Sequence, residues 1–209
     1  MTEIVKTIFS SVEFILLLIS GVFVALAYFI PYVMFPDYAK SKGLSTKEAS
    51  MVITVSGISG IVGRLIVGFI ADTKYANRFI ISGGILILGG MSTFGVVYVE
   101  TMYHWYLVYG AILGIFTGVF AFLQPVLVVD LLGTEHLSVA FGILLLVQGT
   151  CVLIGPPIAG WISDLSGRYD EAFMYAGIMF ATSGLISCSI PLVQSRKSSE
   201  KYNISQCTS

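Results

Sequence analysis

Six long apolar stretches limit what this sequence can fold into. They cover approximately residues 11–35, 47–71, 79–99, 103–129, 138–162 and 172–194. A helix of about 20 apolar residues crosses the hydrocarbon core of a bilayer, and a crossing segment must satisfy its backbone hydrogen bonds internally. Only 11% of the 209 residues are charged, whereas soluble domains carry about 25%. The sequence therefore predicts an all-α membrane protein with six transmembrane helices.

The six stretches divide the chain into regions and bear on its orientation. Residues 1–10 are predicted to be a cytoplasmic N-terminus, residues 11–194 a six-helix transmembrane bundle, and the polar residues 195–209 a disordered cytoplasmic tail. The connections between spans are short, and the first reads PDYAKSKGLST.

An even number of crossings places both termini on one side. Six basic residues would share that side: Lys6, Lys74, Arg78, Arg196, Lys197 and Lys201. Four would lie opposite: Lys40, Lys42, Lys47 and Arg168. This excess favours cytoplasmic termini by the positive-inside tendency.

One arginine, Arg64, lies inside the second apolar stretch, in GIVGRLIVGFIAD. A charge near the bilayer centre costs at least ~2.5–3.5 kcal/mol, so it usually serves a function or is shielded by a partner. Four residues flank it at four-residue steps and share a narrow ribbon of the helix with it: Ser56, Gly60, Gly68 and Asp72.

Two interpretations of Arg64 follow. It binds an anion in a water-filled cavity, because a guanidinium grips a carboxylate through two parallel hydrogen bonds. Alternatively, it is structural and pairs with helix-end carbonyls or with a carboxylate. The first is favoured, because the sequence supplies no obvious deep acidic partner.

The end of the second stretch carries a charged segment, GFIADTKYANR. It resembles G-x-x-x-D-R-x-G-R-R, a signature of the major facilitator superfamily at the cytoplasmic end between the second and third helices of each six-helix half. Gly68, Asp72 and Arg78 match, and Thr73 stands where the signature has its first arginine. The resemblance implies a charge latch that biases inward-facing against outward-facing states. The alternative is an ordinary polar loop.

The fourth stretch contains three glycines at four-residue spacing: Gly110, Gly114 and Gly118. Such a ridge favours close helix packing. Three neighbours are candidate substrate-binding residues if the helix faces a cavity: Phe116, Thr117 and Phe120.

The fifth stretch ends in GPPIAGWISDLSG. Because Pro156 and Pro157 cannot donate backbone hydrogen bonds, the helix is expected to bend or unwind there. A hinge near a gate and a static bend are equally consistent with the pattern.

An enzymatic alternative comes from GISG at residues 57–60, which fits the G-x-S-G pattern of rhomboid intramembrane proteases. A serine nucleophile needs a base within hydrogen-bond reach. The two histidines, His104 and His136, lie at span edges on opposite faces in the predicted topology. We therefore predict a protein that is not an enzyme and has no metal site or cofactor.

Residues 130–177, which begin DLLGTEHLSVAFGILLLVQGT and continue through GPPIAGWISD, carry a wider resemblance. They are similar to the region of helices 10 to 12 in the monocarboxylate transporter family, with its D-L-x-G loop, A-F-G-x-x-L-L-x-Q-G helix start and G-P-P-x-x-G-x-x-x-D segment. GIVGRLIVGFIAD resembles the family's eighth helix, which implies that Arg64 is the ligand of a substrate carboxylate. The resemblance covers nearly all of residues 11–194 and only the C-terminal six of the family's twelve helices.

Two positions depart from the family pattern. Gly60 stands where proton-coupled members carry an aspartate, so uniport or exchange fits better than proton–lactate symport. Thr117 falls near a position where lactate-transporting members carry a bulky aromatic residue, which suits a larger substrate.

The resemblance implies alternating-access transport of an organic monocarboxylate, with this chain supplying the C-terminal half. The alternative is a truncated, non-transporting membrane protein that associates with full-length transporters and modulates them. Expected partners are a small organic anion, membrane lipid, and a second copy or a full-length transporter. A net charge of −1 without a basic cluster gives no reason to expect nucleic acid. The expected location is the plasma membrane, as a multi-pass protein.

Overall fold

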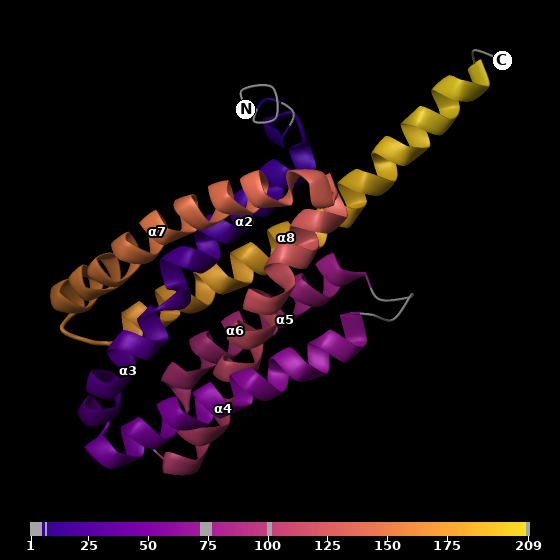
Figure 1. Cartoon of the computed structure of the whole chain (residues 1–209). Coiled ribbons are helices and arrows are strands. Elements are labelled where there is room, and N and C mark those ends of the chain that lie inside the picture. The colour runs from indigo at the N-terminus through magenta and orange to yellow at the C-terminus, as the bar shows by residue number, and fades with distance from the viewer. Residues whose placement is uncertain (1–5, 7, 72–76, 100–101, 208–209) are drawn as a thin grey trace.

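The computed structural model describes residue 6 and residues 8–71, 77–99 and 102–207, and within these residues the chain is helical without strands (Figure 1). The helices are α2 (Val12–Tyr28), α3 (Ile30–Ser41), α4 (Thr46–Ala71), α5 (Arg78–Gly95), α6 (Tyr103–Leu132), α7 (Leu137–Ser166) and α8 (Asp170–Cys207). Short 3₁₀ turns at Val96–Tyr98 and Thr134–His136 adjoin α5 and α7.

Six segments of the described chain are long and apolar enough to cross a membrane, which confirms the predicted all-α class. They are Val12–Ser41, Thr46–Ile70, Arg78–Tyr98, Tyr103–Leu132, Thr134–Ser166 and Asp170–Ser195. The helices alternate in direction, so α2 begins and α8 ends at the same end of the bundle (Figure 1).

The first span differs from its prediction as one helix over residues 11–35. It breaks at Phe29 into α2 and α3 and continues as helix to Ser41, so that much of the predicted connection PDYAKSKGLST is helical. The break has a local cause, because Pro31 has no N–H with which to continue the helical ladder and disfavours helical geometry at the residue before it.

α8 is drawn as helix to Cys207, and its last part projects beyond the bundle (Figure 1). The predicted disorder of residues 195–209 stays a prediction. Residues 195–207 contain no glycine or proline that would end a helix.

The helices are unequally covered by one another. α6 packs on α4, α5 packs on α8, and α2 lies against both α7 and α8. Within the chain, 61% of the most apolar part of α6 is buried, against 22% for α4 and 17% for the span that contains α7. Two helices therefore present long apolar faces outward.

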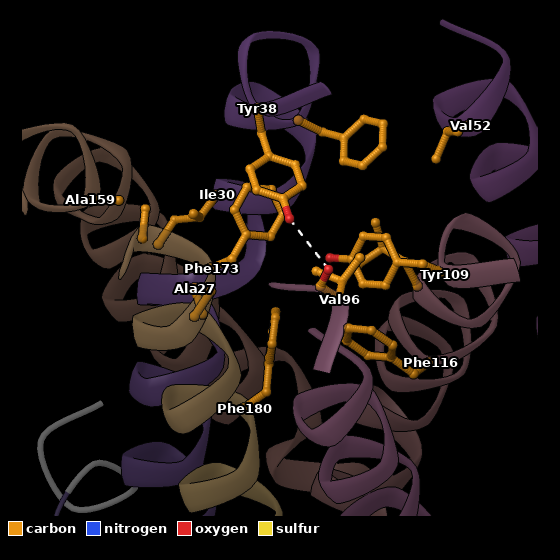
Figure 2. Close-up of a cluster of buried hydrophobic side chains, with 14 of the residues drawn as sticks. Ala27, Ile30, Tyr38, Val52, Val96, Tyr109, Phe116, Ala159, Phe173 and Phe180 are labelled. Carbon is orange, nitrogen blue, oxygen red and sulfur yellow. Dashed lines mark hydrogen bonds between the residues drawn. The ribbon is translucent and has the colours of Figure 1, made fainter. Parts of the chain in front are cut away.

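An aromatic cluster fixes α3 against α6 and α8. The Tyr38 and Phe173 rings lie 4.5 Å apart between centroids, and Phe35 contacts both Tyr106 and Tyr109. The Tyr38 hydroxyl donates a hydrogen bond to the carbonyl oxygen of Val96 at 3.3 Å (Figure 2). This cluster holds the second half of the broken first span in place.

The α4–α6 contact is made through glycine, as the spacing in the fourth stretch predicts. A methyl group on Gly110 would lie 2.7 Å from the carbonyl oxygen of Val52, and one on Gly114 or Gly118 would collide with the α4 backbone. Small residues allow this close approach, in which van der Waals packing drives helix association within a bilayer. The packing fixes how α4 is rotated, and thereby the direction in which Arg64 points.

Candidate functional site

Arg64 lies in the interior of α4, on a part of the helix that its own bundle leaves exposed. Within the described part of the chain its guanidinium makes no hydrogen bond and no ion pair, so the structural interpretation of Arg64 finds no partner there. The Tyr28 phenol, at the end of α2, is close enough for an electrostatic interaction with it.

The ribbon of small residues around Arg64 has one part that packs against α6 and one part that is exposed. Ser56 and Gly60 are buried against α6, whereas Arg64 is exposed and Gly68 is partly exposed. The drift of about 40° per four-residue step explains the division, because the ribbon winds away from α6 along the helix.

A hydroxyl cluster joins three helices near this site. Tyr32 of α3 has its hydroxyl 2.9 Å from Thr117 Oγ1 on α6 and 3.2 Å from Ser56 Oγ on α4. The rings of Tyr28 and Tyr32 lie 6.2 Å apart on either side of the break in the first span. The sequence reasoning missed both tyrosines; the available signal was a polar aromatic pair four residues apart in an apolar segment.

The three residues of the fourth stretch proposed to line one cavity have separate surroundings. Thr117 belongs to the hydroxyl cluster. Phe116 is buried against Phe180 of α8, with ring centroids 5.0 Å apart, and touches Gly89 of α5. Phe120 is 7% exposed and borders a cavity.

That cavity has a volume of about 250 Å³ and lies between α2, α6 and α7. Tyr28, Phe29 and Phe120 contribute aromatic walls, and Gln124 and Gln148 contribute side-chain amides. The described residues that line it are all uncharged. The sequence reasoning had singled out only Phe120 among them.

Two of the predicted gate residues, Gly68 and Arg78, lie towards one end of the bundle. Arg78, the first residue of α5, forms an ion pair with Asp130 near the end of α6, with Nη1 and Oδ1 2.8 Å apart. Gly68 lies in the last turns of α4 beside Phe122, whereas Asp72 falls outside the described residues. Asp130, the aspartate of the D-L-x-G segment, is therefore a partner of Arg78 that the sequence reasoning did not assign.

Pro156 and Pro157 lie within α7, which remains helical from Leu137 to Ser166. The helix therefore does not unwind at the prolines. Gly155, immediately before them, packs against the backbone of Leu26 on α2, which holds this part of α7 against the bundle.

A second charged cluster closes the opposite end. Asp170 Oδ1 lies 2.9 Å from Lys42 Nζ, and its Oδ2 lies 2.6 Å from Arg168 Nη2. The Lys42 ammonium also lies 5.4 Å from the Tyr38 ring centroid. The hydrogen bond and charge of Asp170 raise the pKa of the Arg168 guanidinium. Together these contacts tie α3 to the start of α8.

The remaining candidate sites are the GISG segment and a possible metal site. The Ser59 hydroxyl of the GISG segment donates to the Ser56 carbonyl of its own helix at 3.1 Å. Among the residues that the structure describes, no three His, Cys, Asp or Glu side chains are grouped so as to hold a metal ion.

The chain is similar in sequence to proteins of a known superfamily. Residues 17–205 match the family model described as Major Facilitator Superfamily. The chain is 31% identical over 185 residues to Monocarboxylate transporter 12 of Xenopus laevis, covering 86% of this chain and 38% of that protein. It is 30% identical over 195 residues to Monocarboxylate transporter 14 of Mus musculus, covering 90% and 36%. It is 31% identical over 183 residues to Monocarboxylate transporter 4 of Gallus gallus, covering 86% and 38%. The chain thus spans little more than a third of the length of these relatives.

Proposed function

The chain belongs to the monocarboxylate transporter family of the Major Facilitator Superfamily, and we propose that it forms the C-terminal six-helix bundle of a transporter for an organic monocarboxylate. Arg64 is the residue that carries this proposal. It would bind the carboxylate of the substrate, and the bundle would alternate between inward-facing and outward-facing states around that site.

The surroundings of Arg64 support the assignment. Its guanidinium has no anionic partner in the described chain, and it lies on an exposed side of α4, where residues 49–71 carry no other charge. An uncompensated cation in that position costs at least ~2.5–3.5 kcal/mol. A bound carboxylate offsets that cost through two parallel, charge-assisted hydrogen bonds.

Transport by this fold needs a second bundle, because alternating access rocks one six-helix unit against another around a midplane site. The outward apolar faces of α4 and α7 are suited to such a contact. The second bundle is either another copy of this chain or part of a longer relative. We assign the protein to the plasma membrane, with cytoplasmic termini and with Arg78 and Asp130 at the cytoplasmic gate.

Gly60 bears on energy coupling. A methyl group on Gly60 would already lie 3.2 Å from the backbone oxygen of Gly114. An aspartate at this position, which proton-coupled members carry, would therefore have to push α4 and α6 apart. Uniport or exchange fits this packing better than proton symport.

A second candidate function rests on the same exposed faces of α4 and α7. The chain would associate with a longer transporter through them and modulate it without carrying substrate. The two functions differ in whether the chain supports uptake that depends on Arg64.

Uptake of labelled monocarboxylates into cells that express the chain tests the proposal. The variants are Arg64→Ala, which removes the charge, and Arg64→Lys, which keeps the charge but loses the planar fork. We expect uptake by the unaltered chain, none with Arg64→Ala and poor rescue by Arg64→Lys at equal surface expression. Unimpaired uptake with Arg64→Ala defeats the proposal. Absence of uptake at full surface expression, together with co-purification of a longer transporter, supports the modulator instead.

A further inference from the structure

We propose that Tyr28 is a second ligand of the substrate carboxylate, and that its phenol donates a hydrogen bond to the same carboxylate that the Arg64 guanidinium holds. The inference rests on the proposed function, because it takes Arg64 as the first ligand of that group. It adds to the site a residue from another helix, α2, which neither the sequence motifs nor the names of the relatives assign.

The position of Tyr28 beside α4 is fixed through Tyr32. The Tyr32 hydroxyl lies 3.2 Å from Ser56 Oγ on α4 and 2.9 Å from Thr117 Oγ1 on α6. The Tyr28 ring contacts the Tyr32 ring, with centroids 6.2 Å apart. Tyr28 precedes Tyr32 by four residues, which is about one helical turn. Tyr28 therefore lies about one turn away from the level at which the first span meets Ser56.

The directions of the helices bring Arg64 towards the same level. Because α2 and α4 run in opposite directions (Figure 1), the step back from Tyr32 to Tyr28 and the step forward from Ser56 to Arg64 lead towards the same end of the bundle. Arg64 lies about two turns, or ~12 Å, beyond Ser56. Helical side chains lean towards the N-terminus of their own helix, so those of Tyr28 and Arg64 lean towards each other. Their charges interact, as this convergence requires.

The hydrogen-bonding capacity of a carboxylate leaves room for a second ligand. Its two oxygens offer about four acceptor sites, and a guanidinium bound through two parallel hydrogen bonds occupies two of them.

The Tyr28 phenol has a donor to offer. Its hydroxyl forms no hydrogen bond with any residue that the structure describes. The side chain borders the cavity of about 250 Å³ between α2, α6 and α7, so a molecule in that cavity would touch it. A phenol adds this donor without adding a second charge, which would itself be costly within a bilayer. Arg64 would thus supply the charge, and Tyr28 would fix the orientation of the carboxylate.

Binding of phenylacetate to the full chain in lipid nanodiscs tests the inference. Tyr28→Phe removes the hydroxyl and keeps the ring. Tyr98→Phe makes the same change on the 3₁₀ turn after α5, where the side chain is 69% exposed, and serves as the matched control. Arg64→Ala removes the guanidinium. Circular dichroism and thermal unfolding check that each variant is folded.

An infrared measurement separates a ligand from a residue that only supports the packing. Difference spectra of bound phenylacetate with an isotope-labelled carboxylate report the hydrogen bonds to its oxygens, because each donor shifts the stretching bands of that group. Loss of a direct donor therefore moves these bands, whereas a small change in packing elsewhere leaves them in place.

We expect the unaltered chain and Tyr98→Phe to bind phenylacetate equally tightly. Tyr28→Phe should weaken binding about tenfold or more, as a hydrogen bond to a charged group allows, and it should shift the carboxylate bands of the phenylacetate that still binds at saturating concentration. Arg64→Ala should weaken binding further, because it removes the charge as well as two donors.

Unchanged affinity in Tyr28→Phe, or weaker binding with carboxylate bands identical to those of the unaltered chain, overturns the assignment of Tyr28; loss of binding in Arg64→Ala then leaves the proposed function standing. Undiminished binding by Arg64→Ala overturns the proposed function itself. Absence of saturable binding to the unaltered chain also overturns the assignment of Tyr28, and the uptake assay then decides the function separately.

Discussion

Replacing Gly118 by alanine tests whether the close α4–α6 contact holds the candidate site together. A Cβ at Gly118 would lie 3.0 Å from the carbonyl carbon of Gly60 and nearer still to its oxygen. Carbon atoms in favourable contact lie about 3.5–4.0 Å apart. The two helices must therefore separate by at least about 0.5 Å at this level, on the helix that carries Arg64 one turn further on.

Overpacking of this kind typically costs about 1–3 kcal/mol. Alanine recovers part of that cost, because glycine in a helix interior is about 0.8–1.0 kcal/mol less favourable than alanine. We therefore expect Gly118→Ala to lower the free energy of unfolding by up to about 2 kcal/mol, and by about 1–3 kcal/mol relative to a glycine-to-alanine change that meets no neighbour. It should also weaken monocarboxylate binding, since α4 moves relative to Tyr28.

The matched control is Gly57→Ala on α4, where nothing lies within 4 Å of the added methyl group. This variant should be as stable as the unaltered chain or slightly more stable. Reversible unfolding in mixed micelles, followed by circular dichroism, measures both variants. If Gly118→Ala unfolds with the same free energy as Gly57→Ala, the close packing does not have the role assigned to it.

Three further predictions concern the hydroxyl cluster, Gly60, and the charged cluster around Asp170 at the other end of the bundle. Thr117→Val and Tyr32→Phe should each lower the free energy of unfolding by about 1 kcal/mol. The double variant should lose clearly less than the sum, because each single change already removes the hydrogen bond that Tyr32 and Thr117 share. Strict additivity in a double-mutant cycle would contradict this. Gly60→Asp should destabilise the α4–α6 contact by about 1–3 kcal/mol. It should not make uptake depend on a proton gradient. Gradient-driven uptake by this variant would show that the two helices have room for the carboxylate. Asp170→Asn should cost about 1–3 kcal/mol, because the carboxylate is largely buried between two cations; it should exceed the loss from Asp130→Asn, whose ion pair is about 30% exposed and worth less than about 1 kcal/mol. Thermal unfolding of these two variants side by side decides that order.

The sequence alone predicted the features that depend only on the residues within one segment. The six spans follow from the apolar length of each stretch, and the all-α class follows because a crossing backbone must satisfy its own hydrogen bonds. The glycine spacing of the fourth stretch correctly predicted close helix packing. The break at Phe29 could have been read from Pro31, and the prediction of one straight helix overlooked that signal.

The tertiary structure decided the relations between helices. It determined that Ser56 and Gly60 face α6 while Arg64 does not, and that Arg78 pairs with Asp130. It also brought Gln124 and Gln148 to one cavity from separate helices. Hydrophobicity along the chain fixes which segments enter a membrane, because that free energy is nearly a sum over each segment's own residues. The rotation and pairing of the helices depend on how side chains from distant segments fit together, and no single stretch of the sequence contains that information.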